Sequence, residues 1–159
     1  MRPDLALHLL GVGLAPDRVL ADFGGLAGVD VVQRFDSEEL PHLLASATVG
    51  VFPSYVEGFG FAVLEKLASG MPVVAYDAPG AREMLGDVSW SGLTPPGDLD
   101  AFVGAVLALL DASAQRYERM SREAREVAMK FRWRTIARET LSLYEQRLKT
   151  LSHDESHRP

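Results

Sequence analysis

The stretch EGFGFAVLEKLASGMPVV, residues 57 to 74, joins two short apolar segments and determines our assignment of the fold. TVGVFPS (48–54) precedes it and is typical of a strand, and PVVAYD (72–77) overlaps its end and predicts a second strand. Between them, residues 60 to 69 predict a helix that Gly70 ends, because glycine readily adopts the left-handed conformation that closes many helices. A strand, a helix and a strand with short connections predict two parallel strands.

The same alternation runs through the first 112 residues. Apolar runs predict further strands at 5–11, 29–35 and 88–94, and caps with helical spacing predict further helices at 16–24, 37–47, 80–85 and 98–111. In this prediction Ser37 caps the helix at 37–47. Short parallel strands connected by helices indicate an α/β fold with a Rossmann-like, doubly wound parallel sheet in three α/β/α layers.

The sequence divides the chain into three parts. Residues 1–112 are expected to form the Rossmann-like domain, and residues 113–151 two helices that pack on it and are broken near 131–134. Residues 152–159 are expected to be a disordered tail.

Composition limits the classes of partner. The chain has 159 residues, 47% of them hydrophobic, and no cysteine, which excludes a disulfide framework and a thiolate metal site. Residues 1–112 carry 5 basic and 15 acidic side chains, whereas residues 113–149 carry 10 and 5. The net charge of −6 argues against nucleic acid, and the basic helices leave a membrane surface open as an alternative to a solvated face. Because no signal peptide or membrane span is evident, we expect a cytoplasmic protein, free or peripheral at a membrane.

The loop PSYVEGFG (53–60) follows a strand and precedes a helix, which is where ligands bind in such folds. Backbone N–H groups from Phe59 to Ala62 are expected to be free at the helix start and suit a phosphate or a sugar oxygen. Glu57 can accept hydrogen bonds from sugar hydroxyls, and Glu65 can hold two adjacent ribose hydroxyls, one per oxygen. The alternative is structural, because a glutamate at a helix start often only satisfies the helix dipole and one in mid-helix is usually a surface residue.

EGFGFAVLEKLASGMPVVAYDAPGAREML, residues 57 to 85, resembles the donor-binding signature of retaining glycosyltransferases with the GT-B fold, the large family 4 group. In that family two glutamates are separated by seven residues, as Glu57 and Glu65 are here. The similarity extends over residues 5 to about 148, from LHLLGVG to FRWRTIARETLSLYEQRL. It implies one half of a GT-B fold, the half that binds the nucleotide-sugar donor.

The resemblance implies a role for each residue of this loop and helix. Glu65 would bind the ribose of a UDP-, GDP- or ADP-type donor, and Glu57 would contact the transferred sugar as the catalytic residue. The remaining donor-binding positions would be Ser54, Tyr55, Gly58, Phe59, Gly60, Phe61 and Ala62, with Arg34 and Phe35 bordering the base. No metal or other cofactor is expected, because amides and basic side chains neutralise the leaving diphosphate in this family. The implied chemistry is sugar transfer with retained anomeric configuration through an oxocarbenium-like transition state.

The resemblance also implies what the chain lacks. Enzymes of this type have an N-terminal domain that binds the acceptor, and the Arg and Lys of their diphosphate clamp would precede residue 1. We therefore expect a chain that binds donor weakly and turns over little by itself. The alternatives are a split enzyme that docks to a separate acceptor domain, a non-catalytic nucleotide-sugar module and a remnant without a ligand. Because the last helix of the family braces the missing domain, an apolar stripe on it is expected to be partly uncovered and to invite dimerisation or aggregation: Ile136, Leu141, Leu143, Tyr144 and Leu148.

Other conspicuous residues have simpler explanations. GVG (11–13) lacks the third glycine of a dinucleotide fingerprint and predicts a plain strand-to-helix turn. His8 is expected to be a core histidine with a hydrogen bond, and Arg82 to form an ion pair or a cap. Three large side chains are expected to be packing anchors: Trp90, Trp133 and Tyr144.

Overall fold

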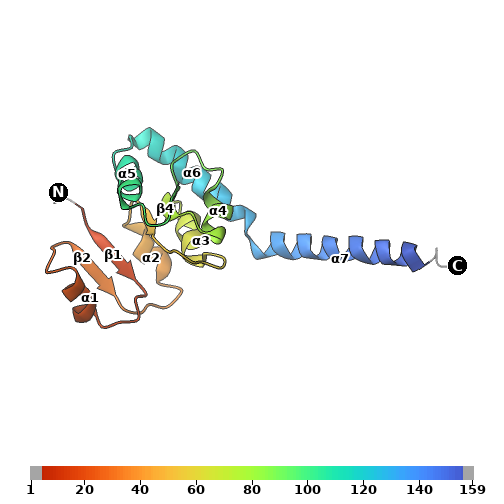
Figure 1. Cartoon of the computed structure of the whole chain (residues 1–159), viewed down its shortest axis with the longest axis horizontal. Helices are drawn as coiled ribbons and strands as arrows, with labels where there is room; N and C mark the ends of the chain where they lie inside the picture. Colours follow the sequence, from red (N-terminus) through yellow and green to blue (C-terminus); the bar gives the residue numbers. More distant parts are fainter. Residues whose placement is uncertain (1–4, 156–159) are drawn as a thin grey trace. The chain divides into compact units, whose positions relative to one another are not determined.

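The computed structural model describes residues 5–155, with side chains through residue 150. Contacts divide the chain into two compact units, with the boundary between Thr48 and Val49. The boundary near residue 112 that the sequence suggests falls inside the second unit, between two of its helices. The predicted α/β class is confirmed, because helices alternate with parallel strands in both units (Figure 1).

The first unit is a strand–helix–strand motif followed by a short helix. β1 (Leu7–Leu10) and β2 (Val29–Val32) pair in parallel over four residue pairs, and α1 (Pro16–Asp22) connects them. α2 (Leu40–Ala45) follows β2. α1 begins with a proline as expected, since the fixed φ of proline suits the first turn of a helix.

Two expectations for the first unit are wrong. The helix expected from Ser37 begins at Leu40, because Pro41 fits the first helical turn, where no N–H is needed. His8 is exposed rather than buried in the core, and its Nδ1 lies 3.4 Å from Oδ2 of Asp30, which is opposite it on β2. Because side chains alternate between the faces of a strand, these two polar residues share the face that the first unit leaves open to solvent.

The strands of the second unit form a parallel sheet in the order β3–β4–β5. They are β3 (Gly50–Phe52), β4 (Val73–Tyr76) and β5 (Leu93–Thr94), connected by α3 (Phe61–Ala68) and α4 (Pro79–Leu85). All four residues of β4 are buried, and because successive side chains point to opposite faces, both faces of this strand are covered. The strand–helix–strand arrangement expected for the stretch around residues 57–74 is thus confirmed.

The core of the second unit lies between its sheet and its helices. Val63 and Leu67 place the apolar face of α3 in this core and are fully buried. Trp90 is the expected packing anchor, since its buried indole Nε1 donates a hydrogen bond to the carbonyl oxygen of Val73 at 2.9 Å. The strand expected at 88–94 is shortened to its last two residues, because the segment around Trp90 turns inward to make this contact.

Helices α5 (Leu99–Leu110) and α6 (Ala114–Lys130) complete the packed part of the second unit. The Asp98 side chain caps α5 by accepting a hydrogen bond from the N–H of Ala101 at 2.9 Å. α6 packs against α3, and α7 (Trp133–Glu155) begins after the break expected near residues 131–134.

Helix α7 exposes its apolar stripe. Tyr144 is 67% exposed and Trp133 is 76% exposed, so the expectation that both are packing anchors is wrong: α7 leaves these side chains to solvent. Leu141, Leu143 and Leu148 are exposed and Ile136 is half-buried, which fits the partly uncovered stripe that we expect. Dimerisation or aggregation through this stripe stays a prediction.

The disordered tail expected from residue 152 is wrong for residues 152–155, which are helical. α7 continues through Glu155, because residues 152–155 include neither glycine nor proline to end the helix, and residues 156–159 lie outside the described part. Among the helices of the described residues, none has both the length and the apolar content needed to cross a membrane.

Candidate functional site

The loop that joins β3 to α3 carries most of the predicted site. Its last residue, Gly60, is the N-cap of α3 and has φ 89° and ψ 47°, a left-handed conformation that favours glycine. The carbonyl oxygen of Gly60 accepts hydrogen bonds from the N–H groups of Val63 and Leu64, at 2.9 and 3.1 Å. No side chain caps this helix. The N–H groups of Phe61 and Ala62 therefore have no partner within α3 and lie at the positive end of the helix dipole.

Glu57 is half-buried in the same loop. Its Oε1 accepts a hydrogen bond from the N–H of Gly58 at 3.0 Å. A β-carbon added to Gly60 would lie 3.5 Å from the Cγ of Glu57, so the glutamate side chain packs beside the N-cap of α3. A negative charge is favourable near a helix start, because the N–H groups of the first turn have no partner within the helix.

Glu65 is exposed on α3, one turn after Phe61. Residues four apart lie on the same face of a helix, and the Cα–Cβ bonds tilt toward the helix N-terminus. The carboxylate of Glu65 is thus directed along the face that begins with the exposed ring of Phe61. Burial of this charge among the core residues, which would be costly, is excluded.

Phe59 is held from three sides within the second unit. Its ring centroid lies 4.9 Å from that of Phe61 and 5.7 Å from that of Phe131. Its backbone lies against Gly80 of α4, where an added β-carbon would be only 2.3 Å from the carbonyl oxygen of Phe59. The loop is therefore anchored by packing at the residue that immediately precedes the helix N-cap.

Ser54 and Tyr55 lie at the start of the loop. The hydroxyl of Ser54 donates a hydrogen bond to the carbonyl oxygen of Val56 at 2.9 Å. The ring of Tyr55, which is 65% exposed, lies against the ring of Tyr76, with centroids 5.1 Å apart. Burial raises the pKa of the Tyr76 hydroxyl above its ordinary value. The electrostatic interaction and the hydrogen bond between Tyr76 and Tyr55 raise this pKa further. The contact between the two rings links the loop to the carboxyl end of β4.

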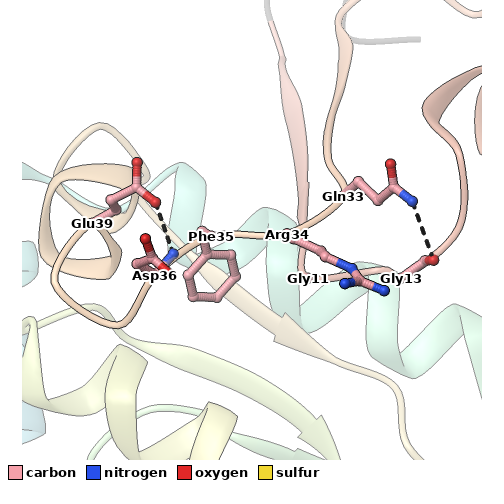
Figure 2. A pocket seen from close by; sticks show the side chains of 7 residues that line it. All are labelled: Gly11, Gly13, Gln33, Arg34, Phe35, Asp36 and Glu39. Carbon is pink, nitrogen blue, oxygen red and sulfur yellow. Dashed lines mark hydrogen bonds between the residues drawn. The ribbon is translucent and has the colours of Figure 1, made fainter.

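Arg34 and Phe35 belong to the first unit and line an open cavity of about 640 Å³ there. It lies beyond the carboxyl ends of β1 and β2, which is where ligands bind in parallel sheets, and Figure 2 shows the side chains that surround it. The side-chain amide of Gln33 donates to the carbonyl oxygen of Gly13 at 3.4 Å, and Glu39 accepts from the N–H of Asp36 at 2.8 Å. These two bonds stabilise the rim, and the role of Arg34 and Phe35 at a nucleobase stays a prediction.

Comparison with known proteins identifies the family. The model of the family described as glycosyl transferases group 1 matches residues 1–127. The chain belongs to this family. Over 132 residues, 82% of the chain, it is 34% identical to the MMP alpha-(1->4)-mannosyltransferase of Mycolicibacterium hassiacum, covering 32% of that protein. The chain thus spans about a third of the length of this relative of the glycosyl transferases group 1 family.

Solved structures agree with this assignment to the glycosyl transferases group 1 family. Sucrose-phosphate synthase from Thermosynechococcus elongatus superposes with a TM-score of 0.71 at 28% identity, over 84% of this chain and 34% of that one. The Anabaena protein HepE in complex with UDP-glucose superposes with a TM-score of 0.60 at 24% identity, over 86% of this chain and 35% of that one. At 24% identity, the similarity to HepE concerns the fold alone. The α/β architecture is therefore that of GT-B glycosyltransferases.

Two contacts of the site are not evident from the sequence. Gly80 follows a proline at a helix start and resembles any turn glycine, although it allows the close approach of Phe59. Tyr76 resembles a core residue of β4, although its ring supports Tyr55. The alternating pattern could have suggested only that Tyr76 lies at the ligand-binding end of its strand. Among the described residues, no three His, Cys, Asp or Glu side chains gather as a metal site would require.

The ion pair expected for Arg82 is confirmed beside this site. Its Nε and Nη2 donate hydrogen bonds to the two carboxylate oxygens of Asp77, at 2.7 and 2.9 Å. The hydrogen bond from Arg82 holds the pKa of Asp77 below its ordinary value. The fork of two bonds ties the end of β4 to α4, the helix that contains Gly80.

We expect Arg82→Gln to make the free energy of unfolding less dependent on acidic pH. A carboxyl group whose folded-state pKa is lowered contributes stability that is present above the unfolded pKa, about 3.9, and is lost as pH falls through the folded pKa. Without Arg82 this contribution is absent, so the free energies of unfolding of the parent and the variant should differ above about pH 4 and approach each other as pH falls further. Urea unfolding from pH 7 to pH 3 measures this, with Arg122→Gln at an exposed position of α6 as the charge control. An unchanged pH profile in Arg82→Gln would contradict the expectation.

Proposed function

We propose that this chain is the donor-binding half of a retaining glycosyltransferase of the family 4 group, which takes a hexose from a UDP-, GDP- or ADP-sugar. The carrying observation is the loop before α3, where Glu57 and the free N–H groups of a helix start lie together at the end of β3. Membership in the glycosyl transferases group 1 family supports a transferase reaction at this loop.

The proposed donor binds the second unit through complementary charge. Its diphosphate accepts hydrogen bonds from the N–H groups of Phe61 and Ala62, which have no partner within α3 and are favoured by the helix dipole. Its ribose hydroxyls donate to the two oxygens of Glu65, one turn along the exposed face of the same helix. The sugar lies at the amides of Phe59 and Gly60 and beside the carboxylate of Glu57.

The proposed reaction depends on stabilising the leaving group. As the bond between the sugar and the diphosphate breaks, negative charge grows on the diphosphate and positive charge on the sugar ring. In this proposal the start of α3 faces the diphosphate and the carboxylate of Glu57 faces the sugar ring. Both interactions therefore strengthen toward the transition state. No step of this scheme requires a metal ion.

We propose that the acceptor is bound by a separate domain, in the same polypeptide or in another one. The relative is about two and a half times as long as this chain, since 82% of the chain covers 32% of that protein. The exposed apolar stripe of α7 supports such a contact, because an apolar helix face of this kind is normally covered. By itself the chain is expected to bind donor weakly and to transfer little sugar.

An NMR titration of the whole chain tests the proposal. UDP-glucose, GDP-mannose and ADP-glucose are added separately to millimolar concentration, with NAD and free glucose as controls. We expect one of the nucleotide sugars to shift the amide signals of Phe59, Gly60, Phe61 and Ala62 in a saturable manner, and the controls to leave them unchanged. Equal shifts with NAD, or no shift with any nucleotide sugar, would contradict the proposed function.

A further inference from the structure

Phe131 lies between the last two helices and contacts the loop of residues 53–60 before α3, which is called the donor loop below. It is the C-cap residue of α6, directly before the break that leads into α7, and it is half-buried. Its ring meets that of Phe59 edge to face, with an interplanar angle of 73° and a centroid distance of 5.7 Å. The ring of Phe59 in turn lies 4.9 Å from that of Phe61, the first residue of α3. Three rings thus connect the end of α6 to the start of α3.

The position of Phe59 controls the groups proposed to hold the donor. The next residue, Gly60, is the left-handed N-cap whose conformation sets the direction of the first N–H groups of α3. Glu57 is two residues earlier and packs beside the same N-cap. On one side the backbone of Phe59 is confined by Gly80, and its ring needs support on the other side to stay in place.

We propose that Phe131 is a positioning residue that holds the loop from Glu57 to Gly60 in its donor-binding conformation. The proposal rests on the function proposed above, because it assigns a purpose to a contact of the same site. Phe131 supplies the supporting ring from outside the loop, and edge-to-face aromatic pairs contribute stabilisation beyond the area that they bury. The junction of α6 and α7 is thereby coupled to the donor site within the second unit.

Four variants of the whole chain separate positioning from general stability. Phe131→Ala removes the ring, Phe131→Leu keeps an apolar side chain of similar volume, and Phe131→Tyr keeps the ring. Val127→Ala is the matched control, because it removes a buried apolar side chain from the same helix one turn earlier and outside the three rings. Phe131→Leu keeps the test valid if Phe131→Ala does not fold.

Two measurements are made on each variant. Order parameters from ¹⁵N relaxation at Gly58, Phe59 and Gly60 report the mobility of the loop without ligand, and they do not depend on the ring current that Phe131 itself produces. Calorimetry with the nucleotide sugar that the parent binds gives Kd. We expect Phe131→Ala and Phe131→Leu to lower the loop order parameters toward 0.6 and to raise Kd by about 2- to 10-fold. Phe131→Tyr should restore both, and Val127→Ala should change neither.

The outcomes distinguish this inference from the proposed function. Loop order parameters that are unchanged in Phe131→Ala would overturn the inference, whether or not the parent binds a donor. Equal donor affinity in the parent and Phe131→Ala would overturn it while leaving the proposed function intact. A mobile loop in Phe131→Ala, together with a parent that binds no nucleotide sugar, would support Phe131 as the anchor of the loop and contradict the proposed function.

Discussion

Glu65→Ala is expected to weaken the binding of the nucleotide sugar by about 100-fold. The variant removes the acceptor of two proposed hydrogen bonds from ribose hydroxyls, and a hydrogen bond to a charged group contributes about 1.5 kcal/mol or more. Two such bonds correspond to about 3 kcal/mol, or roughly a factor of 100 in Kd. Because Glu65 is exposed, its replacement should change the free energy of unfolding by less than about 0.5 kcal/mol.

Calorimetric titration of the parent and the variant measures this effect. Glu139→Ala is the matched control, since it removes the same charge from an exposed position of α7 and should leave Kd unchanged. If Glu65→Ala and Glu139→Ala weakened binding equally, the effect would come from net charge rather than from the proposed ribose contact. Unchanged affinity in Glu65→Ala would place the ribose elsewhere.

Gly80→Ala is expected to lower the free energy of unfolding by about 2–3 kcal/mol, the upper part of the range for overpacking. The added β-carbon would lie 2.3 Å from the carbonyl oxygen and 2.5 Å from the carbonyl carbon of Phe59. Both are backbone atoms, so no side chain can rotate away, and either α4 or the donor loop has to move. Because Phe59 precedes the N-cap of α3, the variant should also reduce donor affinity.

Urea unfolding monitored by the fluorescence of Trp90 and Trp133 gives the change in stability. Gly104→Ala is the control: Gly104 lies inside α5, an added β-carbon there meets no atom within 4 Å, and alanine should stabilise the helix by about 1 kcal/mol. The same substitution should therefore have opposite effects at the two glycines. If Gly80→Ala changed neither the free energy of unfolding nor the donor affinity, the close approach of Gly80 to Phe59 would not be needed for stability or for donor binding.

Much of the second unit is predictable because its local signals agree with one another. The helix expected at 60–69 is observed at 61–68, and Gly70 ends it in the left-handed conformation, with φ 83°. The strand expected at 72–77 is the buried β4. The apolar pattern and the position of Gly70 predict the same boundary between helix and strand. The tertiary structure keeps both elements where these local signals place them.

Apart from the shorter elements observed near 37–47 and 88–94 and the longer last helix, the expectations that failed concern burial. His8 has the sequence environment of a core strand but lies on the open face of β1, beside Asp30. Trp90 and Trp133 are equally apolar. Trp90 is buried and donates a hydrogen bond to Val73 of β4, whereas Trp133 is exposed. Whether a side chain is buried depends on which element packs over it, and that element is distant in the sequence.

The sequence by itself determined the order of strands and helices, the left-handed stops at glycines and the loop that places Glu57 before a helix start. These features follow from interactions between residues a few positions apart. Only the tertiary structure decided that Gly80 and Phe131, which are 21 and 72 positions from Phe59 in the sequence, hold that loop from two sides. The reason is physical: contacts at such separations depend on how whole elements pack, which no local pattern of residues encodes.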